Sequence, residues 1–96
     1  MRDLRLRKAA RADLAEIWKF SRRTYSLDSA LAYYNGLIDR MEALQSDIRL
    51  ARSYPAISGL KFVKYGAHFI YFRAGDTRLE IVRVLHERRD QNKALP

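Results

Sequence analysis

Alternating apolar and polar positions near the C-terminal end of the chain predict two adjacent β-strands. Residues 68–73 and residues 77–86 both alternate with a period of two, and Gly75-Asp76 supplies a turn between them. The opposite faces carry His68, Ile70 and Phe72 against Phe69, Tyr71 and Arg73 on the first strand, and Leu79, Ile81 and Leu85 against Val82 and Val84 on the second. Because both faces are apolar, these strands need cover on both sides, from the rest of the chain or from a partner.

A period close to 3.6 residues predicts two consecutive helices in the first half of the chain. The first runs from about Ala9 to Tyr25, and the second follows Ser26, which can cap it, with Asp28 in its first turn. Gly36 lies within the second helix, where its missing side chain suggests a close backbone approach. One apolar stripe on each helix contains Ala10, Leu14, Ile17 and Trp18, and Ala30, Tyr34, Leu37, Met41, Leu44 and Ile48.

Shorter segments complete the predicted order of elements. Residues 3–7 alternate as a first strand, residues 60–65 form another strand, and residues 88–95 form a short helix or a tail. The order is therefore a strand, a helical hairpin and a three-strand antiparallel meander, with the first strand joining the sheet beside one of the others. This order predicts one α+β domain over residues 1–96. The expected core is Leu14, Ile17, Trp18, Leu37, Met41, Leu44, Ile70, Phe72, Val82 and Val84.

Composition and charge narrow the classes of function. The chain has no cysteine, which excludes disulfides, thiol nucleophiles and cysteine-based zinc sites. No apolar run approaches the roughly 20 residues of a membrane span, and the N-terminus lacks the apolar centre of a signal peptide, so we expect a cytoplasmic protein. Lys and Arg number 19 against 11 Asp and Glu, a net charge of +8. That excess favours nucleic acid, a nucleoprotein machine or an acidic protein as partner.

The candidate chemistry is sparse. The sequence contains no phosphate-binding glycine loop, nucleophile elbow or metal-ligand cluster, and we expect no metal and no cofactor. His86, close to Arg83, Arg88 and Arg89, is either a general acid–base group among phosphate-binding arginines or a histidine that closes the end of the sheet. Aromatic residues beside basic ones are either core residues or a surface for stacking bases: Tyr33, Tyr34, Tyr65, Phe69, Tyr71 and Phe72.

Four segments of the chain resemble the ParE toxins of bacterial toxin–antitoxin modules, which belong to the wider RelE/ParE superfamily. They are residues 12–18 (Ala-Asp-Leu-Ala-Glu-Ile-Trp), 59–61 (Gly-Leu-Lys), 68–73 (His-Phe-Ile-Tyr-Phe-Arg) and 81–90 (Ile-Val-Arg-Val-Leu-His-Glu-Arg-Arg-Asp). They occur in the family's order and span nearly the whole chain, and the valine-leucine-histidine ending is the most specific of them. The resemblance implies a helical hairpin packed on one face of an antiparallel sheet.

The resemblance also implies a function and partners. The activity would be inhibition of DNA gyrase, which blocks replication, with no catalytic residue in the toxin itself. The cognate antitoxin would be ParD-like, with a C-terminal segment that wraps the toxin in a hetero-oligomeric complex. For contact with the target or the antitoxin we predict the basic C-terminal end of the chain: Arg73, Arg83, His86, Arg88 and Arg89, with the tail to Leu95.

Two alternatives remain open from the sequence. RelE-type relatives cleave messenger RNA on the ribosome, and here His86 or Lys64 would move the proton while Arg88 holds the scissile phosphate. The other alternative is a basic nucleic-acid-binding domain, whose affinity would fall steeply with salt.

Overall fold

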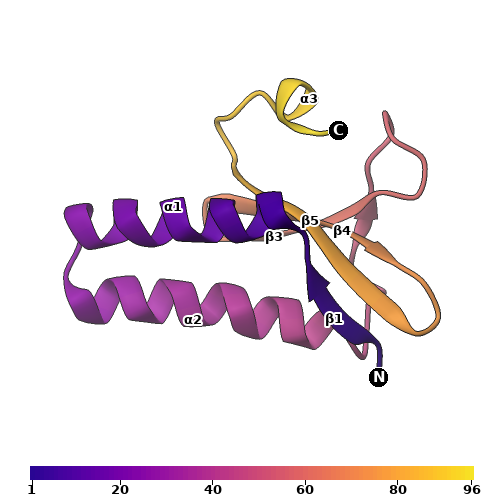
Figure 1. The fold of residues 1–96 in the computed structure, drawn as a ribbon, viewed down its shortest axis with the longest axis horizontal. Helices are drawn as coiled ribbons and strands as arrows, with labels where there is room; N and C mark the ends of the chain where they lie inside the picture. Colours follow the sequence, from indigo (N-terminus) through magenta and orange to yellow (C-terminus); the bar gives the residue numbers. More distant parts are fainter.

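A five-stranded mixed sheet with a helical hairpin packed against it forms the body of the chain (Figure 1). The computed structural model describes residues 1–96. In chain order the elements are β1 (Asp3–Leu6), α1 (Lys8–Thr24), α2 (Leu27–Leu44), β2 (Arg52–Ser53), β3 (Lys61–Tyr65), β4 (His68–Ala74), β5 (Arg78–His86) and α3 (Gln91–Ala94). The strand order is β1-β5-β4-β3-β2, and only β1 and β5 pair in parallel. The predicted α+β class and order of elements are confirmed.

The structure differs from the prediction at the end of the second helix and by one additional short strand. Helix α2 ends at Leu44, before Ile48, because the following residue turns to the N-terminal strand: the Gln45 carbonyl accepts from the Arg2 N–H at 2.9 Å, and its side-chain amide donates to the Arg2 carbonyl at 2.8 Å. Ile48 still packs against the core from the loop. The short strand β2 was not predicted, since two residues carry no readable alternation.

The hairpin is built from the predicted local signals. The Ser26 hydroxyl caps α2 by accepting from the Ser29 N–H at 3.1 Å. A Cβ added at Gly36 would lie 1.7 Å from the Tyr65 hydroxyl, so the close approach expected there comes from a side chain of β3 rather than from backbone. Neither helix of the hairpin, nor α3, combines the length and apolarity that a membrane span requires.

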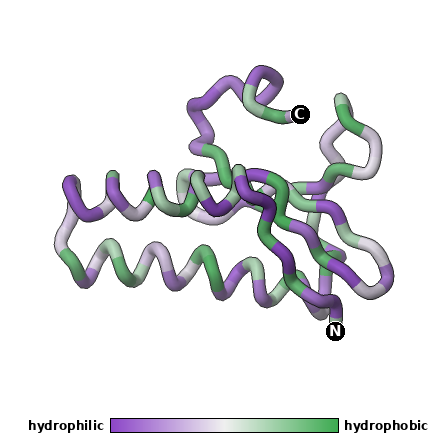
Figure 2. Tube along the Cα trace, viewed as in Figure 1, coloured by the Kyte–Doolittle hydropathy of each residue, from purple (hydrophilic) through white to green (hydrophobic).

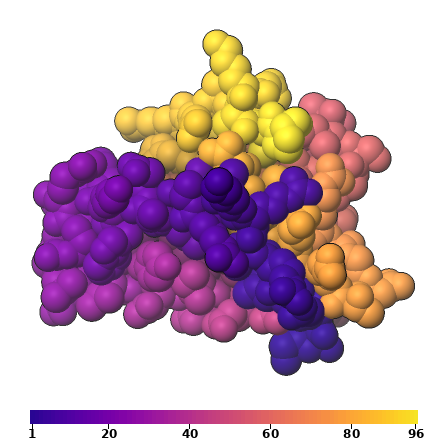
Figure 3. All heavy atoms as spheres, in the orientation of Figure 1, coloured from indigo at the N-terminus to yellow at the C-terminus, as the bar shows by residue number.

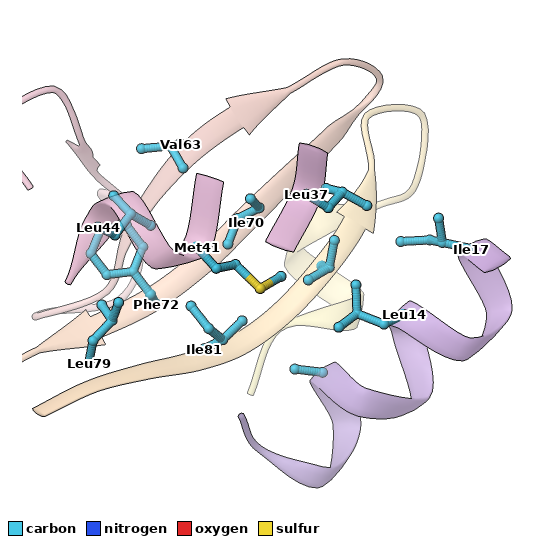
Figure 4. Packing of buried hydrophobic residues seen from close by; sticks show 12 residues of the cluster. Leu14, Ile17, Leu37, Met41, Leu44, Val63, Ile70, Phe72, Leu79 and Ile81 are labelled. Atoms are coloured by element: carbon cyan, nitrogen blue, oxygen red, sulfur yellow. The ribbon is translucent and has the colours of Figure 1, made fainter. Parts of the chain in front are cut away.

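Apolar residues from the hairpin meet one face of the sheet in the main core, which we call the helix-side core. Figure 4 shows the Met41 side chain of α2 lying between Ile70 and Ile81 of the sheet, and Leu14 and Leu37 belong to the same cluster. The complete set is Ala10, Leu14, Ile17, Leu37, Met41, Leu44, Val63, Ile70, Phe72, Leu79, Ile81 and Val84.

Nine of the ten residues expected in the core are buried, and Trp18 is not. Its ring lies half-buried between α1 and α2, with its centroid 5.8 Å from that of Tyr34 in an edge-on arrangement. The prediction for Trp18 was wrong because it sits at the margin of the apolar stripe, facing the second helix and solvent rather than the sheet.

A β-bulge changes which residues of β5 face the helices. Tyr71 pairs with Arg83 but Phe72 pairs with Ile81, so Val82 is an extra residue on β5. The expected alternation is therefore wrong beyond Ile81: Val84 joins the helix-side core, while Val82 and Leu85 face away from the helices.

The side of the sheet that faces away from the hairpin is covered by the chain's own C-terminal segment. Leu95 is 7% exposed and packs with Leu60, Tyr71, Val82 and Leu85, a set we call the outer cluster. The Tyr71 hydroxyl donates to the Gln91 side chain at 2.6 Å, and Tyr54 bonds Asn92. Figure 3 shows the C-terminal segment, in yellow, projecting from the surface of the molecule. Part of the cover that the two-sided apolar strands require thus comes from the short helix α3.

Candidate binding surfaces

A cavity of about 800 Å³ opens where the start of β4 and the end of β5 meet the hairpin. His68 and His86 are direct partners on these strands, with ring centroids 5.3 Å apart and planes nearly perpendicular. Both line the cavity together with Tyr33 of α2, whose hydroxyl lies 2.6 Å from His68 Nδ1 and accepts from the Ala67 N–H at 3.2 Å. This link fastens α2 to the β3–β4 turn and orients His68.

Protonation of His68 is disfavoured in this setting. Burial, and after it the neighbouring His86, lower the pKa of His68 to about 4. Burial also raises the pKa of Tyr33, so its hydroxyl keeps its proton. At neutral pH the wall of the cavity therefore presents an uncharged imidazole and an uncharged phenol.

The lowered pKa predicts acid sensitivity of the fold. The pKa of His68 is about 6.5 in the unfolded chain and about 4 in the folded chain. The contribution of His68 to stability is therefore complete above pH 6.5 and is lost as the pH falls from 6.5 toward 4. When the pH is lowered from 7 to 5, the free energy of unfolding should fall in the native chain and in the His68→Gln variant. Because His68 is partly accessible to water, we expect the fall to be only about 1 kcal/mol smaller in the variant. Urea denaturation at several pH values measures this difference, and parallel pH profiles would contradict it.

Arg83 is held within the fold. Its guanidinium forms a two-pronged ion pair with Asp13 of α1, with Nε–Oδ2 at 2.7 Å and Nη2–Oδ1 at 2.8 Å, and its Nη1 donates to the Ala94 carbonyl at 2.8 Å. Asp13 Oδ2 also accepts from the Val84 N–H at 2.9 Å. Strand β1 pairs with β5 only as far as Ile81, so the Val84 N–H has no partner on β1. Asp13 supplies the missing acceptor at this strand edge.

The turn that follows β5 is the exposed part of the predicted contact set. Arg88 and Arg89 are both exposed and form no ion pair, and Figure 2 shows this connection as a hydrophilic segment leading to α3. The turn is ordered locally: the Arg88 N–H donates to His86 Nδ1 at 3.1 Å, and the Gln91 side chain donates to the Arg89 carbonyl at 2.6 Å. Two free guanidinium groups are thus presented from a fixed backbone.

The other predicted residues lie elsewhere. Arg73 is near the far end of β4 from His68, where its Nη1 donates to the Ser58 carbonyl at 3.0 Å. Lys64 lies on the outer face, 5.8 Å from the centre of the Phe69 ring and 3.1 Å from Glu87 Oε2. The hydrogen bond from Lys64 lowers the pKa of Glu87. Since His86 lines the helix-side cavity, the structure puts His86 and Lys64 on opposite faces of the sheet.

A second surface, an apolar groove between α1 and α2, was missed from the sequence. It has a volume of about 540 Å³, and seven of its nine lining residues are hydrophobic. Trp18 and Tyr34 form part of its wall, and Leu31 is 41% exposed at its margin. The signal was present as the wide apolar stripe of both helices, which exceeds what the sheet can cover. The lining residues are Leu6, Arg11, Leu14, Ala15, Trp18, Leu31, Tyr34, Asn35 and Ile38.

Comparison with known proteins agrees with this geometry. The sequence profile of the family described as "ParE toxin of type II toxin-antitoxin system, parDE" matches residues 4–91. Toxin ParE1 of Caulobacter vibrioides is 30% identical over 95 residues, covering 91% of each chain. Toxin ParE1 of Mycobacterium tuberculosis (strain H37Rv) is 30% identical over 92 residues, covering 94% of each chain.

A solved structure shares the fold. It is described as "Chromosomal ParDE TA system from P. aeruginosa", and it superposes with a TM-score of 0.75 at 19% identity, over 90% of this chain and 96% of the other. Together with the profile match over residues 4–91, these relatives settle the family. The chain belongs to the ParE toxin family of the ParDE type II toxin–antitoxin systems.

Proposed function

We propose that this chain acts as a toxin by inhibiting DNA gyrase, and that it does so through binding rather than catalysis. The observation that carries the proposal is the exposed pair Arg88 and Arg89, held on an ordered turn at the family-specific end of β5. Gyrase works on DNA, and unpaired arginines are the groups that pair best with the carboxylates or phosphates of such a target. His86, beside the cavity, completes this surface.

The arrangement of possible catalytic groups supports binding over cleavage. A ribonuclease would need a proton-transfer group and a phosphate-binding cation around one reacting atom. His86 and Lys64 lie on opposite faces of the sheet, and Lys64 is paired with Glu87 at 3.1 Å. Arg88 follows His86 closely in sequence, but only its backbone N–H, not its guanidinium, is hydrogen-bonded to the histidine ring, so His86, Lys64 and Arg88 do not form one catalytic group.

A supercoiling assay with purified gyrase, ATP and relaxed plasmid tests this proposal. We expect loss of supercoiling that increases with the concentration of the chain, together with accumulation of cleaved plasmid. Circular dichroism on the same preparation verifies the fold. A folded chain that leaves supercoiling unchanged at a tenfold molar excess over gyrase would reject gyrase as the target and direct attention to messenger RNA cleavage on the ribosome.

The groove between α1 and α2 is proposed as the binding site of the cognate ParD-like antitoxin. An apolar helix face would bury Trp18, Tyr34 and Leu31, which water now contacts. The net charge of +8 favours an acidic antitoxin segment over a basic one. An antitoxin segment in the groove would leave Arg88 and Arg89 uncovered. Another part of the antitoxin would then cover these two arginines, or the antitoxin would release the toxin from gyrase without contacting them.

This proposal predicts the effect of a charge in the groove. Leu31→Glu is expected to weaken antitoxin binding about 10- to 100-fold, because a carboxylate would have to be buried against Trp18 and Tyr34. Leu31 is 41% exposed, so the fold should persist. Isothermal titration with the purified antitoxin measures the loss. Ala32→Glu, an exposed neighbour that does not line the groove, is the matched control, and equal effects of the two changes would remove the groove from the interface.

A further inference from the structure

The cavity beside the two histidines has a rim of exposed aromatic residues that the fold itself does not need. Phe20 and Tyr25, near the end of α1, are 54% and 58% exposed and line the opening. Ile17 and Val84, both buried, lie at its apolar wall. Figure 1 shows that the end of the hairpin where α1 leads into α2 extends beyond the sheet. A cavity of about 800 Å³ is large enough to admit a bulky side chain of a partner.

Free positive charge flanks this opening on two sides. Arg23 of α1 lines the cavity, Arg88 and Arg89 follow His86 at the end of β5, and none of the three forms an ion pair. The carboxylates on the wall are already matched: Asp13 pairs with Arg83 at 2.7 Å, and Glu16 pairs with Lys19 at 3.6 Å.

We propose that this cavity is a docking site for an acidic protein segment that inserts one large apolar side chain between Phe20, Tyr25 and Val84. Arg23 on one side, and Arg88 and Arg89 on the other, would pair with acidic residues that flank the anchor. The buried residues Ile17 and Val84 in the wall offer a large side chain an apolar contact that a charged phosphate backbone cannot make, which favours a protein occupant over nucleic acid. The identification of this segment as part of the toxin's target rests on the proposed function.

The site is separate from the groove proposed for the antitoxin. Helix α1 presents Ala15 and Trp18 to the groove and Glu16 and Phe20 to the cavity, so the two surfaces lie on different sides of one helix. One helix could therefore serve two partners.

The binding test uses a synthetic acidic peptide with one central tryptophan, and the same peptide with serine in place of tryptophan. In ¹⁵N-labelled chain we expect amide shifts centred on Ala67, Val84 and the end of α1, and at least tenfold weaker binding of the serine peptide. The double variant Phe20→Ser/Tyr25→Ser should also bind at least tenfold more weakly. Leu27→Ser is the matched control, since Leu27 is 47% exposed in the same hairpin but does not line the cavity.

Other outcomes would overturn the proposal. Shifts located elsewhere, equal binding by the double variant, or tighter binding of a single-stranded oligonucleotide at this cavity would each do so. The double variant is also tested on gyrase, where at least tenfold weaker inhibition is expected. Inhibition equal to that of the native chain would reject the cavity as the target site while leaving gyrase inhibition standing. If the native chain does not inhibit gyrase, the proposed function fails, and the peptide titration alone decides whether the cavity docks acidic segments.

Discussion

Replacing Asp13 with alanine is expected to lower the free energy of unfolding by about 3 kcal/mol, a large part of the stability of a domain of this size. The Asp13 and Arg83 side chains are only 10% and 17% exposed, so removal of one partner leaves the other charge uncompensated in a poorly hydrated place. The change also deprives the Val84 N–H of its acceptor and loosens the support that Arg83 gives to the Ala94 carbonyl. Urea denaturation followed by circular dichroism measures the loss.

The control for this prediction is an ion pair with a similar distance and a different environment. Asp3 and Arg5 approach to 2.9 Å but are 61% and 63% exposed, so Asp3→Ala should cost less than about 0.5 kcal/mol. A double-mutant cycle of Asp13→Ala and Arg83→Ala should show that the double variant loses less than the sum of the single variants, because no unpaired charge then remains. Equal losses for Asp13→Ala and Asp3→Ala would show that Asp13 is not needed at the strand edge.

Asp13 also shows where sequence reasoning reaches its limit. Its position off the apolar stripe of α1 is readable from the helical period and predicts a solvent-exposed residue. Its actual role depends on β1 being four residues long and therefore leaving part of β5 unpaired. That vacancy arises from pairing between residues about seventy positions apart, which no local pattern encodes. Features that depend on neighbouring residues alone were predicted correctly, as in the Ser26 cap, whose two partners are three positions apart.

The candidate surfaces divide along the same line. The basic residues after β5 could be named from the sequence because charge and the end of a strand are local properties. The bulge at Val82 could not, since it is visible only when β4 and β5 are paired, and it decides that Val84 faces the cavity. The exposure of Phe20 likewise depends on how far the hairpin extends past the sheet, so its aromatic ring was not recognised as a surface feature.

Reversing the charge of the turn after β5 is expected to have the largest effect on function. If gyrase is the target, Arg88→Glu/Arg89→Glu should raise the concentration needed for half-inhibition by about 100-fold, as two central guanidinium contacts become two repulsive carboxylates. Both side chains are exposed and unpaired, so the free energy of unfolding should change by no more than about 0.5 kcal/mol. Supercoiling assays on the variant, with its unfolding curve, measure both quantities.

The control must separate a specific contact from the general effect of lowering the net charge. Arg52→Glu/Arg78→Glu makes the same change of four charge units at exposed positions on β2 and at the start of β5, away from the turn. If the arginines acted only through long-range attraction to gyrase and DNA, both double variants would weaken inhibition equally. High salt would then weaken inhibition by the native chain as much as either double substitution does. A loss confined to the Arg88 and Arg89 variant would instead place the contact at the end of β5, where the short helix α3 and the His86 ring fix the backbone that presents the two arginines.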